Sequence, residues 1–305
     1  MASDEAAPLR TYRGNCHCGA FVYEAELPEI TAATECPCSI CRKKGYLLVG
    51  ANTETAHFKV VKGSLKSLPE YTFGTKALCH KFCSNCGTAV LATVPSAQAP
   101  EKNIYLNVHA IQGIDTWTLK RTPVDGTKIG APYEEPKHTG PVPTVEVEGG
   151  KLYTGSCHCG KLTIAAKIKR LEDDKDSGMI ECNCSICERN AYLWVYPKAE
   201  QVVLSGRAED TGLYRFNHEV QAKPFCRTCG VSMSNPSNAA TTANEAAARL
   251  PYADTAQRER VREYVEKHRT MHPVNVRVLH GVDFQRLHVK RFDGAKLIPP
   301  PYVNP

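Results

Sequence analysis

Short runs of alternating apolar and polar residues recur along the chain, and they predict β-strands. Residues 20–25 (Ala-Phe-Val-Tyr-Glu-Ala) and 161–166 (Lys-Leu-Thr-Ile-Ala-Ala) have the two-residue period of a half-buried strand. Two aromatic and aliphatic stretches, 46–49 and 192–196, also favour strands, because bulky and branched side chains pack well on a pleated sheet. Turn residues separate these runs, so we expect a mainly β fold.

The pattern occurs twice along the chain, which indicates a tandem duplication. Residues 12–19 (YRGNCHCG) return as residues 153–160 (YTGSCHCG). Further on, residues 107–115 (NVHAIQGID) are answered by residues 275–283 (NVRVLHGVD). Matches at both ends of a copy mean that each copy is a complete folding unit.

The repeat sets the expected domain limits. We predict a first domain over residues 10–122 and a second over residues 151–305. Between them, residues 123–150 are rich in proline and glycine and predict a linker that is extended rather than folded.

The second copy carries an insertion, at about residues 238–270, that the first copy lacks. Two capping boxes, at residues 242–245 and 254–257, predict the starts of two helices. Val261, Tyr264, Val265 and His268 fall on one face of the second helix. A surface decoration is the simpler interpretation of this insertion, and a lid over one site is the alternative.

Fourteen of the 15 cysteines fall into matched motifs. Each copy contains, in order, a C-x-C pair, a C-x-C-S-I-C trio and a C-x-x-C-G pair. The trios are Cys36, Cys38 and Cys41 in the first copy, and Cys182, Cys184 and Cys187 in the second. Clustered thiolates at these spacings are typical of metal sites, and zinc is the ion that prefers tetrahedral sulfur ligands without redox chemistry.

Seven sulfurs per copy divide naturally into four and three. Four ligands close a structural zinc site, whereas three leave the open position that catalytic zinc sites share. The spacing also permits other divisions, such as a tetrahedron of Cys36, Cys41, Cys83 and Cys86. The residues alone leave this choice open.

Composition and charge exclude several classes of protein. The formal charge of +6 counts cysteines as neutral, and fourteen thiolates on four zinc ions would cancel it. The chain has no block of five basic residues and no apolar run long enough for a membrane span, so we expect no nucleic-acid or membrane partner. The acidic start lacks the pattern of a secretory signal, which predicts a cytoplasmic or nuclear protein with reduced thiols.

The order of these motifs resembles the family of glutathione-dependent formaldehyde-activating enzymes, which includes centromere protein V. The resemblance implies one β-tent domain per copy, each with a structural zinc and a second, more labile zinc. It implies up to four zinc ions per chain, two structural and two labile. The implied structural ligands are Cys16, Cys18, Cys83 and Cys86 in the first copy and Cys157, Cys159, Cys226 and Cys229 in the second. The implied ligands of the labile, catalytic zinc ions are the two trios.

The resemblance also implies a reaction. Zinc with three thiolates suits a soft thiol as its fourth ligand, and coordination turns that thiol into a nucleophile. The expected activity is that of a zinc-dependent carbon–sulfur lyase acting on thiol adducts, most like S-(hydroxymethyl)glutathione synthase, with glutathione or a glutathione-like adduct as its partner. The alternatives are a non-catalytic scaffold held together by zinc, and an enzyme of the same fold recruited to a specialised small-molecule pathway.

Overall fold

The computed structural model describes residues 8–51, 58–94, 104–172, 175, 178–250, 254–298 and 300–305. The chain divides into two compact units, and the main boundary between them lies between Tyr133 and Glu134. This boundary falls inside the stretch 123–150 that the sequence predicts to be a linker. The predicted domain limits themselves stay a prediction.

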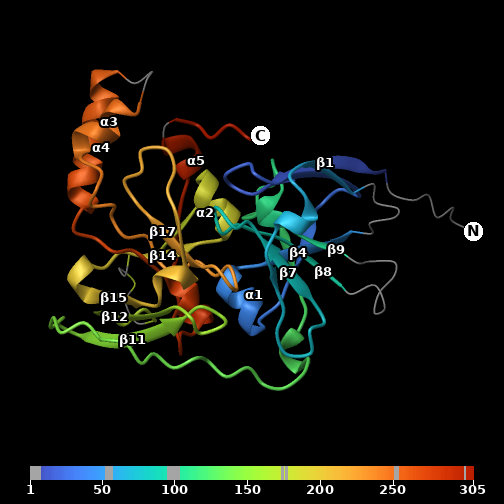
Figure 1. Cartoon of the computed structure of the whole chain (residues 1–305), viewed down its shortest axis with the longest axis horizontal. Coiled ribbons are helices and arrows are strands. Elements are labelled where there is room, and N and C mark those ends of the chain that lie inside the picture. The colour runs from blue at the N-terminus through green and yellow to red at the C-terminus, as the bar shows by residue number, and fades with distance from the viewer. Residues whose placement is uncertain are drawn as a thin grey trace, which may run out of the picture. The chain divides into compact units, whose positions relative to one another are not determined.

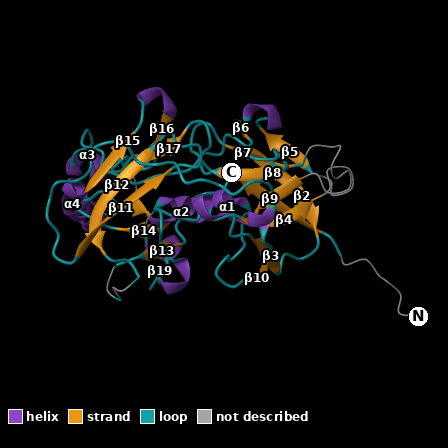
Figure 2. Ribbon diagram, turned by 90° about the horizontal axis from the view of Figure 1, so that it is seen from below, coloured by secondary structure: helices purple, strands orange, loops and turns teal. Residues whose placement is uncertain are grey.

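The first unit is built mainly of strands, which are joined by one short α-helix and several single 3₁₀ turns (Figure 1, Figure 2). Its elements are β1 (Arg10–Asn15), β2 (Val22–Leu27), β3 (Ala32–Glu35), α1 (Ser39–Lys44), β4 (Leu47–Ala51), β5 (Lys59–Lys62), η1 (Leu65–Ser67), β6 (Glu70–Tyr71), β7 (Cys79–Phe82), β8 (Ala89–Thr93), β9 (Ile104–Asn107), η2 (Val108–Ala110), β10 (Lys120–Pro123) and η3 (Gly126–Lys128).

Two sheets make up the first unit. The small sheet has the order β1-β2-β5, and the large sheet has the order β10-β3-β4-β9-β8-β7-β6. Among the described strands of the large sheet, β10 and β3 pair in parallel, with Lys120 opposite Ala32, and the other pairs are antiparallel. Strands β8 and β9 are almost fully buried, and Leu91 and Leu106 are both 0% exposed. These apolar strands form the core that holds the cysteine-bearing turns in place.

The second unit repeats much of this order of elements, and its described residues form three further α-helices, α3, α4 and α5. Its elements are β11 (Gly150–Ser156), β12 (Thr163–Lys169), β13 (Ile180–Cys182), α2 (Ser185–Asn190), β14 (Leu193–Val195), η4 (Ala199–Gln201), β15 (Val202–Ser205), η5 (Ala208–Asp210), β16 (Thr211–Tyr214), β17 (Lys223–Cys226), α3 (Ala243–Ala248), α4 (Thr255–His268), β18 (Val274–Asn275), η6 (Val276–Val278), η7 (Phe284–Arg286), β19 (Lys290–Phe292) and α5 (Gly294–Leu297).

The sheets of the second unit correspond to those of the first. The order β11-β12-β15 matches β1-β2-β5, and β19 pairs in parallel with β13 as β10 does with β3. The large sheet is split here into β18-β14-β13-β19 and β16-β17. Residues 232–234 connect the two parts through the isolated bridges Phe225↔Ser232 and Ser234↔Val274.

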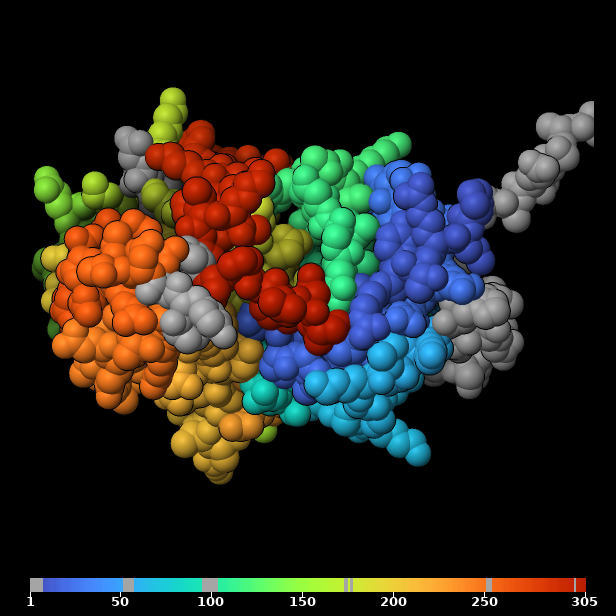
Figure 3. Space-filling model, turned by 90° about the horizontal axis from the view of Figure 1, so that it is seen from above, coloured from blue at the N-terminus to red at the C-terminus, as the bar shows by residue number. Residues whose placement is uncertain are grey.

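The insertion of the second unit is helical, as the sequence predicts. Helices α3 and α4 begin with the two predicted capping boxes, at Thr242 and Asp254. Val265 is buried and, with Val261, packs against Val220. The two helices form the orange part of the surface in Figure 3. Residues 251–253 lie outside the described residues.

The mainly β prediction is confirmed. The four predicted strand segments overlap β2, β4, β12 and β14. The sequence analysis did not predict α1 and α2, which begin directly after Cys38 and Cys184. In the described ranges, no helix has the length and apolar character needed to cross a membrane.

Candidate metal centres

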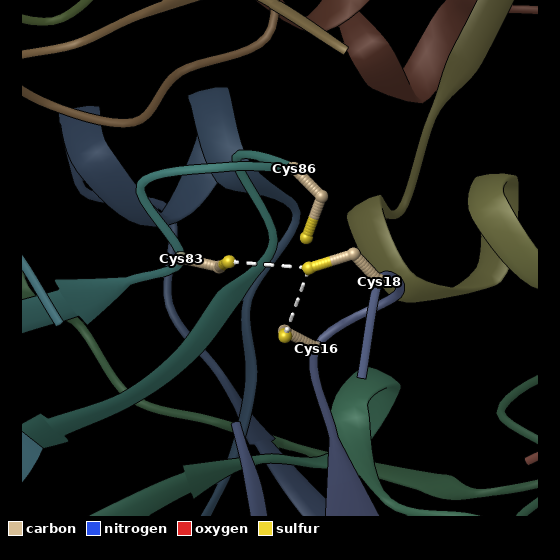
Figure 4. Close-up of side chains that lie close together, drawn as sticks. All are labelled: Cys16, Cys18, Cys83 and Cys86. Carbon is tan, nitrogen blue, oxygen red and sulfur yellow. Dashed lines mark hydrogen bonds between the residues drawn. The ribbon is translucent and has the colours of Figure 1, made fainter. Parts of the chain in front are cut away.

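Four cysteine sulfurs of the first copy lie close together, and we call them the first four-cysteine group. Cys16 and Cys18 lie in the turn after β1, and Cys83 and Cys86 lie in the turn between β7 and β8 (Figure 4). Two of the Sγ–Sγ separations, Cys16 to Cys18 and Cys18 to Cys83, are 3.6 Å. Four sulfurs at ~2.3 Å from a zinc ion lie ~3.8 Å apart in a tetrahedron, so the group fits a zinc ion without rearrangement.

The second four-cysteine group repeats this geometry. It consists of Cys157 and Cys159, after β11, with Cys226 and Cys229, at the end of β17. The Sγ–Sγ separations are 3.6 Å between Cys157 and Cys159 and 3.5 Å between Cys159 and Cys226. In both groups all sulfurs lie within 4.8 Å of one another, and none of these cysteines forms a disulfide.

Backbone geometry holds the four-cysteine groups in shape. The amides of Phe21 and Leu162 donate hydrogen bonds to Cys16 Sγ and Cys157 Sγ, at 3.3 and 3.2 Å. Gly87, which follows Cys86, has φ +72°, in the left-handed region where glycine avoids the steric cost of a side chain. The glycine of the C-x-x-C-G pair is therefore needed for the turn itself.

The two trios form the first and second three-cysteine groups, and each lies where a strand passes into a short helix. Cys182 ends β13, Cys184 is the N-terminal cap of α2, and Cys187 lies inside α2. Cys36, Cys38 and Cys41 have the same arrangement between β3 and α1. The backbone angles of the two capping cysteines nearly coincide, at φ −61°, ψ 160° for Cys38 and φ −60°, ψ 155° for Cys184. Within each group all sulfurs lie within 4.8 Å of one another.

The sulfurs thus assemble as four and three in each copy, which is the division that the resemblance implies. The alternative tetrahedron of Cys36, Cys41, Cys83 and Cys86 does not assemble, because Cys83 and Cys86 meet Cys16 instead. The assignment of a metal, and of a catalytic role, to these groups stays a prediction.

Within each three-cysteine group the pKa values diverge: those of Cys41 and Cys187 are raised because their thiols donate hydrogen bonds to their neighbours and are buried. The pKa of Cys36 is lowered to about 5, chiefly because the Cys41 thiol donates a hydrogen bond to it, and the amides of Cys38 and Gly126 add to the effect. The pKa of Cys184 is lowered to about 3 by hydrogen bonds from the thiols of Cys182 and Cys187. The lowered pKa values favour the thiolate form of Cys36 and Cys184, which is the form that binds a metal ion.

Two glycines that the sequence analysis missed lie against these sulfurs. The amide of Gly126 donates to Cys36 Sγ at 3.3 Å, and a Cβ atom at Gly126 would lie 2.8 Å from that sulfur. A Cβ atom at Gly294 would lie 2.5 Å from Cys182 Sγ. Gly126 falls in the predicted linker, but both glycines follow the strand that pairs in parallel with the strand before the trio.

A sequence signal for these glycines exists. Each follows an aspartate, in Asp125-Gly126 and Asp293-Gly294, and each lies eleven residues after the aspartate that ends the NV…D motif. The duplication therefore extends further along the chain than the motifs used to define it.

Trp194 makes a second contact that the sequence did not reveal. Its indole Nε1–H donates a hydrogen bond to Cys187 Sγ at 3.3 Å, and the side chain is 2% exposed. The sequence predicts a strand over residues 192–196, and the structure adds this contact of Trp194 with the second three-cysteine group. Hydrogen bonds to sulfur stabilise the thiolate and orient it.

Comparison with known proteins agrees with these motifs. The family model described as "Glutathione-dependent formaldehyde-activating enzyme" matches residues 11–118 and 152–267. A crystal structure of a Rhodobacter sphaeroides protein matches at 32% sequence identity, covering 36% of this chain and 99% of that chain, with a TM-score of 0.31. Because the family model matches more than half of the sequence, in two successive segments, the chain belongs to the family of glutathione-dependent formaldehyde-activating enzymes.

Proposed function

We propose that this protein is a zinc-dependent carbon–sulfur lyase that forms and cleaves adducts between a thiol and a small aldehyde. Family membership supports the reaction class, with glutathione and formaldehyde as the reactants and S-(hydroxymethyl)glutathione as the product. The observation that carries the proposal is the assembly of a four-cysteine and a three-cysteine group in each copy. Fourteen thiol ligands suit a reducing compartment, and we propose the cytoplasm.

The four-cysteine groups have a structural role in this proposal. Four sulfurs complete a tetrahedron, so no position remains for a substrate. Each group ties the turn after the first strand of its unit to the turn between later strands. Up to two zinc ions per chain would therefore stabilise the fold, and up to two more would occupy the three-cysteine groups.

The three-cysteine groups would hold the reaction centre. A zinc ion bound there supplies a soft electrophilic centre that keeps a substrate thiol in its thiolate form at neutral pH. The substrate sulfur adds to the aldehyde carbon, the carbon–oxygen π bond opens, and the oxygen takes up the proton that the thiol released. The reverse sequence cleaves the carbon–sulfur bond.

The chain's own residues fix the geometry of this centre. The amides of Cys38 and Cys184 donate to the sulfurs of Cys36 and Cys182, at 3.4 and 3.3 Å, and hold each C-x-C pair in a fixed turn. Gly126 adds a further amide to Cys36 Sγ. These hydrogen bonds lower the basicity of the cysteine sulfurs, so the substrate sulfur remains the strongest nucleophile at the site.

Exchange spectroscopy tests the proposal, because it measures the rate of adduct formation and cleavage at equilibrium. We expect the protein to accelerate exchange of ¹³C-formaldehyde with glutathione above the uncatalysed rate. The variants Cys38→Ser and Cys184→Ser should each lose part of this acceleration, and the double variant all of it. Cys79→Ser is the matched control, because Cys79 belongs to none of the four groups.

Two outcomes would contradict the proposal. A double variant that exchanges as fast as the parent would place the chemistry elsewhere. A parent protein that binds zinc fully but does not accelerate exchange would favour the zinc-containing scaffold over the enzyme.

A further inference from the structure

Lys223, the first residue of β17, carries an ammonium group that is buried in the second unit. The residue is 5% exposed, and its Nζ donates a hydrogen bond to Asn235 Oδ1 at 2.7 Å. The same Nζ lies 5.9 Å from the ring centroid of Trp194 and 5.7 Å from that of Phe216. Within the described ranges, no carboxylate forms an ion pair with Lys223.

A buried charge with only neutral partners is costly, and a nearby anion offsets that cost. The second three-cysteine group is the anionic centre nearby. Trp194 connects the two, because its Nε1–H donates to Cys187 Sγ and its ring lies beside the Lys223 ammonium. A single indole ring thus separates the ammonium from the sulfur. Burial lowers the pKa of Lys223, and the cysteines of this group act in the opposite direction.

The first unit has a different residue at the equivalent position. His80 lies three residues before Cys83, as Lys223 lies three residues before Cys226. The His80 ring stacks on Tyr46, with centroids 5.5 Å apart. Histidine therefore occupies the place of the lysine, among aromatic rings of the same kind.

In the first unit the end of the helix carries buried lysines: Lys43 is 1% exposed, and its counterpart in the second unit, Arg189, is 5% exposed. Lys44, the last residue of α1, is 5% exposed, and its Nζ lies 4.8 Å from the ring centroid of Phe82 and 5.8 Å from that of Tyr46. In the second unit the residue equivalent to Lys44 is Asn190.

At these two positions the first unit has His80 and Lys44, and the second unit has Lys223 and Asn190. One buried ammonium over aromatic rings is kept in each unit, although a helix supplies it in one unit and a strand in the other. Both units share a three-cysteine group. Lys44 lies on the helix that carries Cys41, and Lys223 lies beside the indole bound to Cys187.

We propose that Lys44 and Lys223 are positioning residues that supply the counter-charge of the three-cysteine groups and so allow an anionic fourth ligand, a thiolate, to bind. Three thiolates and a divalent ion carry one net negative charge, and a bound substrate thiolate adds another. A nearby ammonium offsets this repulsion in the low-dielectric interior. The proposal rests on the proposed function, and it predicts that each site prefers a thiolate to a neutral fourth ligand such as water.

The test measures thiol binding to the second three-cysteine group alone, in the full-length chain. The Cys38→Ser substitution removes one ligand of the first three-cysteine group and so prevents thiol binding there. Co²⁺ replaces zinc, because the sulfur-to-metal absorption of Co²⁺ changes when a further thiolate binds. 2-Mercaptoethanol is the probe thiol. Lys223→Met, which keeps the length of the side chain, should weaken its binding about tenfold, the effect of losing one unit charge at close range in the protein interior.

A rescue variant separates charge from packing. Lys223→His combined with Asn190→Lys copies the arrangement of the first unit, and it should restore probe binding to nearly the parent value. Lys223→Arg keeps the charge and should bind the probe thiol better than Lys223→Met does. It therefore serves as a second test if Lys223→Met fails to fold. The mirror experiment uses Lys44→Met in a Cys184→Ser background.

The outcomes distinguish this inference from the proposed function. If the Cys38→Ser protein binds Co²⁺ and the probe but Lys223→Met binds the probe equally well, the counter-charge role is wrong and the proposed function stands. If the Cys38→Ser protein binds no probe thiol, the proposed function and this inference are both wrong.

Discussion

Replacing Gly294 by alanine tests how closely the chain packs against the second three-cysteine group. A Cβ atom at this position would lie 2.5 Å from Cys182 Sγ and 3.0 Å from Cys184 Cβ. The backbone at Gly294 is not in the left-handed region, and the residue begins α5. Without a steric conflict, alanine would therefore stabilise the protein by about 0.4–1 kcal/mol.

The steric conflict makes the substitution destabilising instead of stabilising. Real Cβ contacts do not fall below 3.0 Å, so the sulfur or the α5 backbone must move by at least half an ångström. Overpacking of this kind costs ~1–3 kcal/mol. A metal ion bound by this group would fix the position of Cys182 Sγ, so the strain would fall on the metal-bound state. We expect zinc affinity at this group to fall ~10- to 100-fold, at 1.4 kcal/mol per factor of ten.

Competition with a chromophoric chelator measures this affinity. Gly126→Ala should weaken the first three-cysteine group in the same way, because its Cβ would lie 2.8 Å from Cys36 Sγ. Gly281→Ala is the matched control, because no atom lies within 4 Å and only its φ of +66° is strained. It should lower the free energy of unfolding by ~1 kcal/mol without changing zinc affinity. Unchanged zinc affinity in Gly294→Ala would refute the reasoning.

Three further predictions concern single residues of the second unit. Trp194→Phe removes the hydrogen bond from the indole N–H to Cys187 Sγ. Metal binding should weaken about five- to tenfold, because one lost hydrogen bond costs ~1 kcal/mol. Equal results for both proteins in competition with a chelator would contradict this prediction. Ala191 follows α2 with φ 48°, in the left-handed region, and the first unit has Gly45 at the same place with φ 61°. Because glycine adopts this conformation without strain, Ala191→Gly should raise the free energy of unfolding by up to ~1 kcal/mol. A lower urea midpoint would show that packing of the methyl group contributes more than the strain costs. Burial lowers the pKa of His272 to about 4, below its unfolded value of ~6.5, so the folded state loses stability as pH falls from ~6.5 towards 4. His272→Gln should remove this part of the acid sensitivity, and identical pH profiles of the urea midpoint would contradict the assignment.

Much of this architecture can be predicted from the sequence, because the same motifs occur in both copies. Strand periodicity before and after each trio predicts β2, β4, β12 and β14, and two capping boxes predict α3 and α4. The division of sulfurs into four and three came from the family resemblance, since spacing alone permitted another tetrahedron.

Long-range contacts account for what the sequence analysis missed. Gly126 and Gly294 reach the trios because a late strand pairs in parallel with the strand before each trio, and only a comparison of the two copies beyond the cysteine motifs would have pointed to them. Helices α1 and α2 have six residues each, too few for a helical period to emerge. The buried lysines Lys44 and Lys223 lie at non-equivalent sequence positions, so an alignment of the motifs does not pair them.

Zinc content during stepwise chelation tests the central claim most directly. The account predicts that the purified protein contains up to four zinc ions per chain, that a mild chelator removes those held by the three-cysteine groups, and that catalysed exchange of formaldehyde with glutathione disappears with them. The fold should survive this step, as judged by circular dichroism, because the four-cysteine groups keep their ions. A protein that keeps full exchange activity after the three-cysteine groups have been emptied would contradict the account.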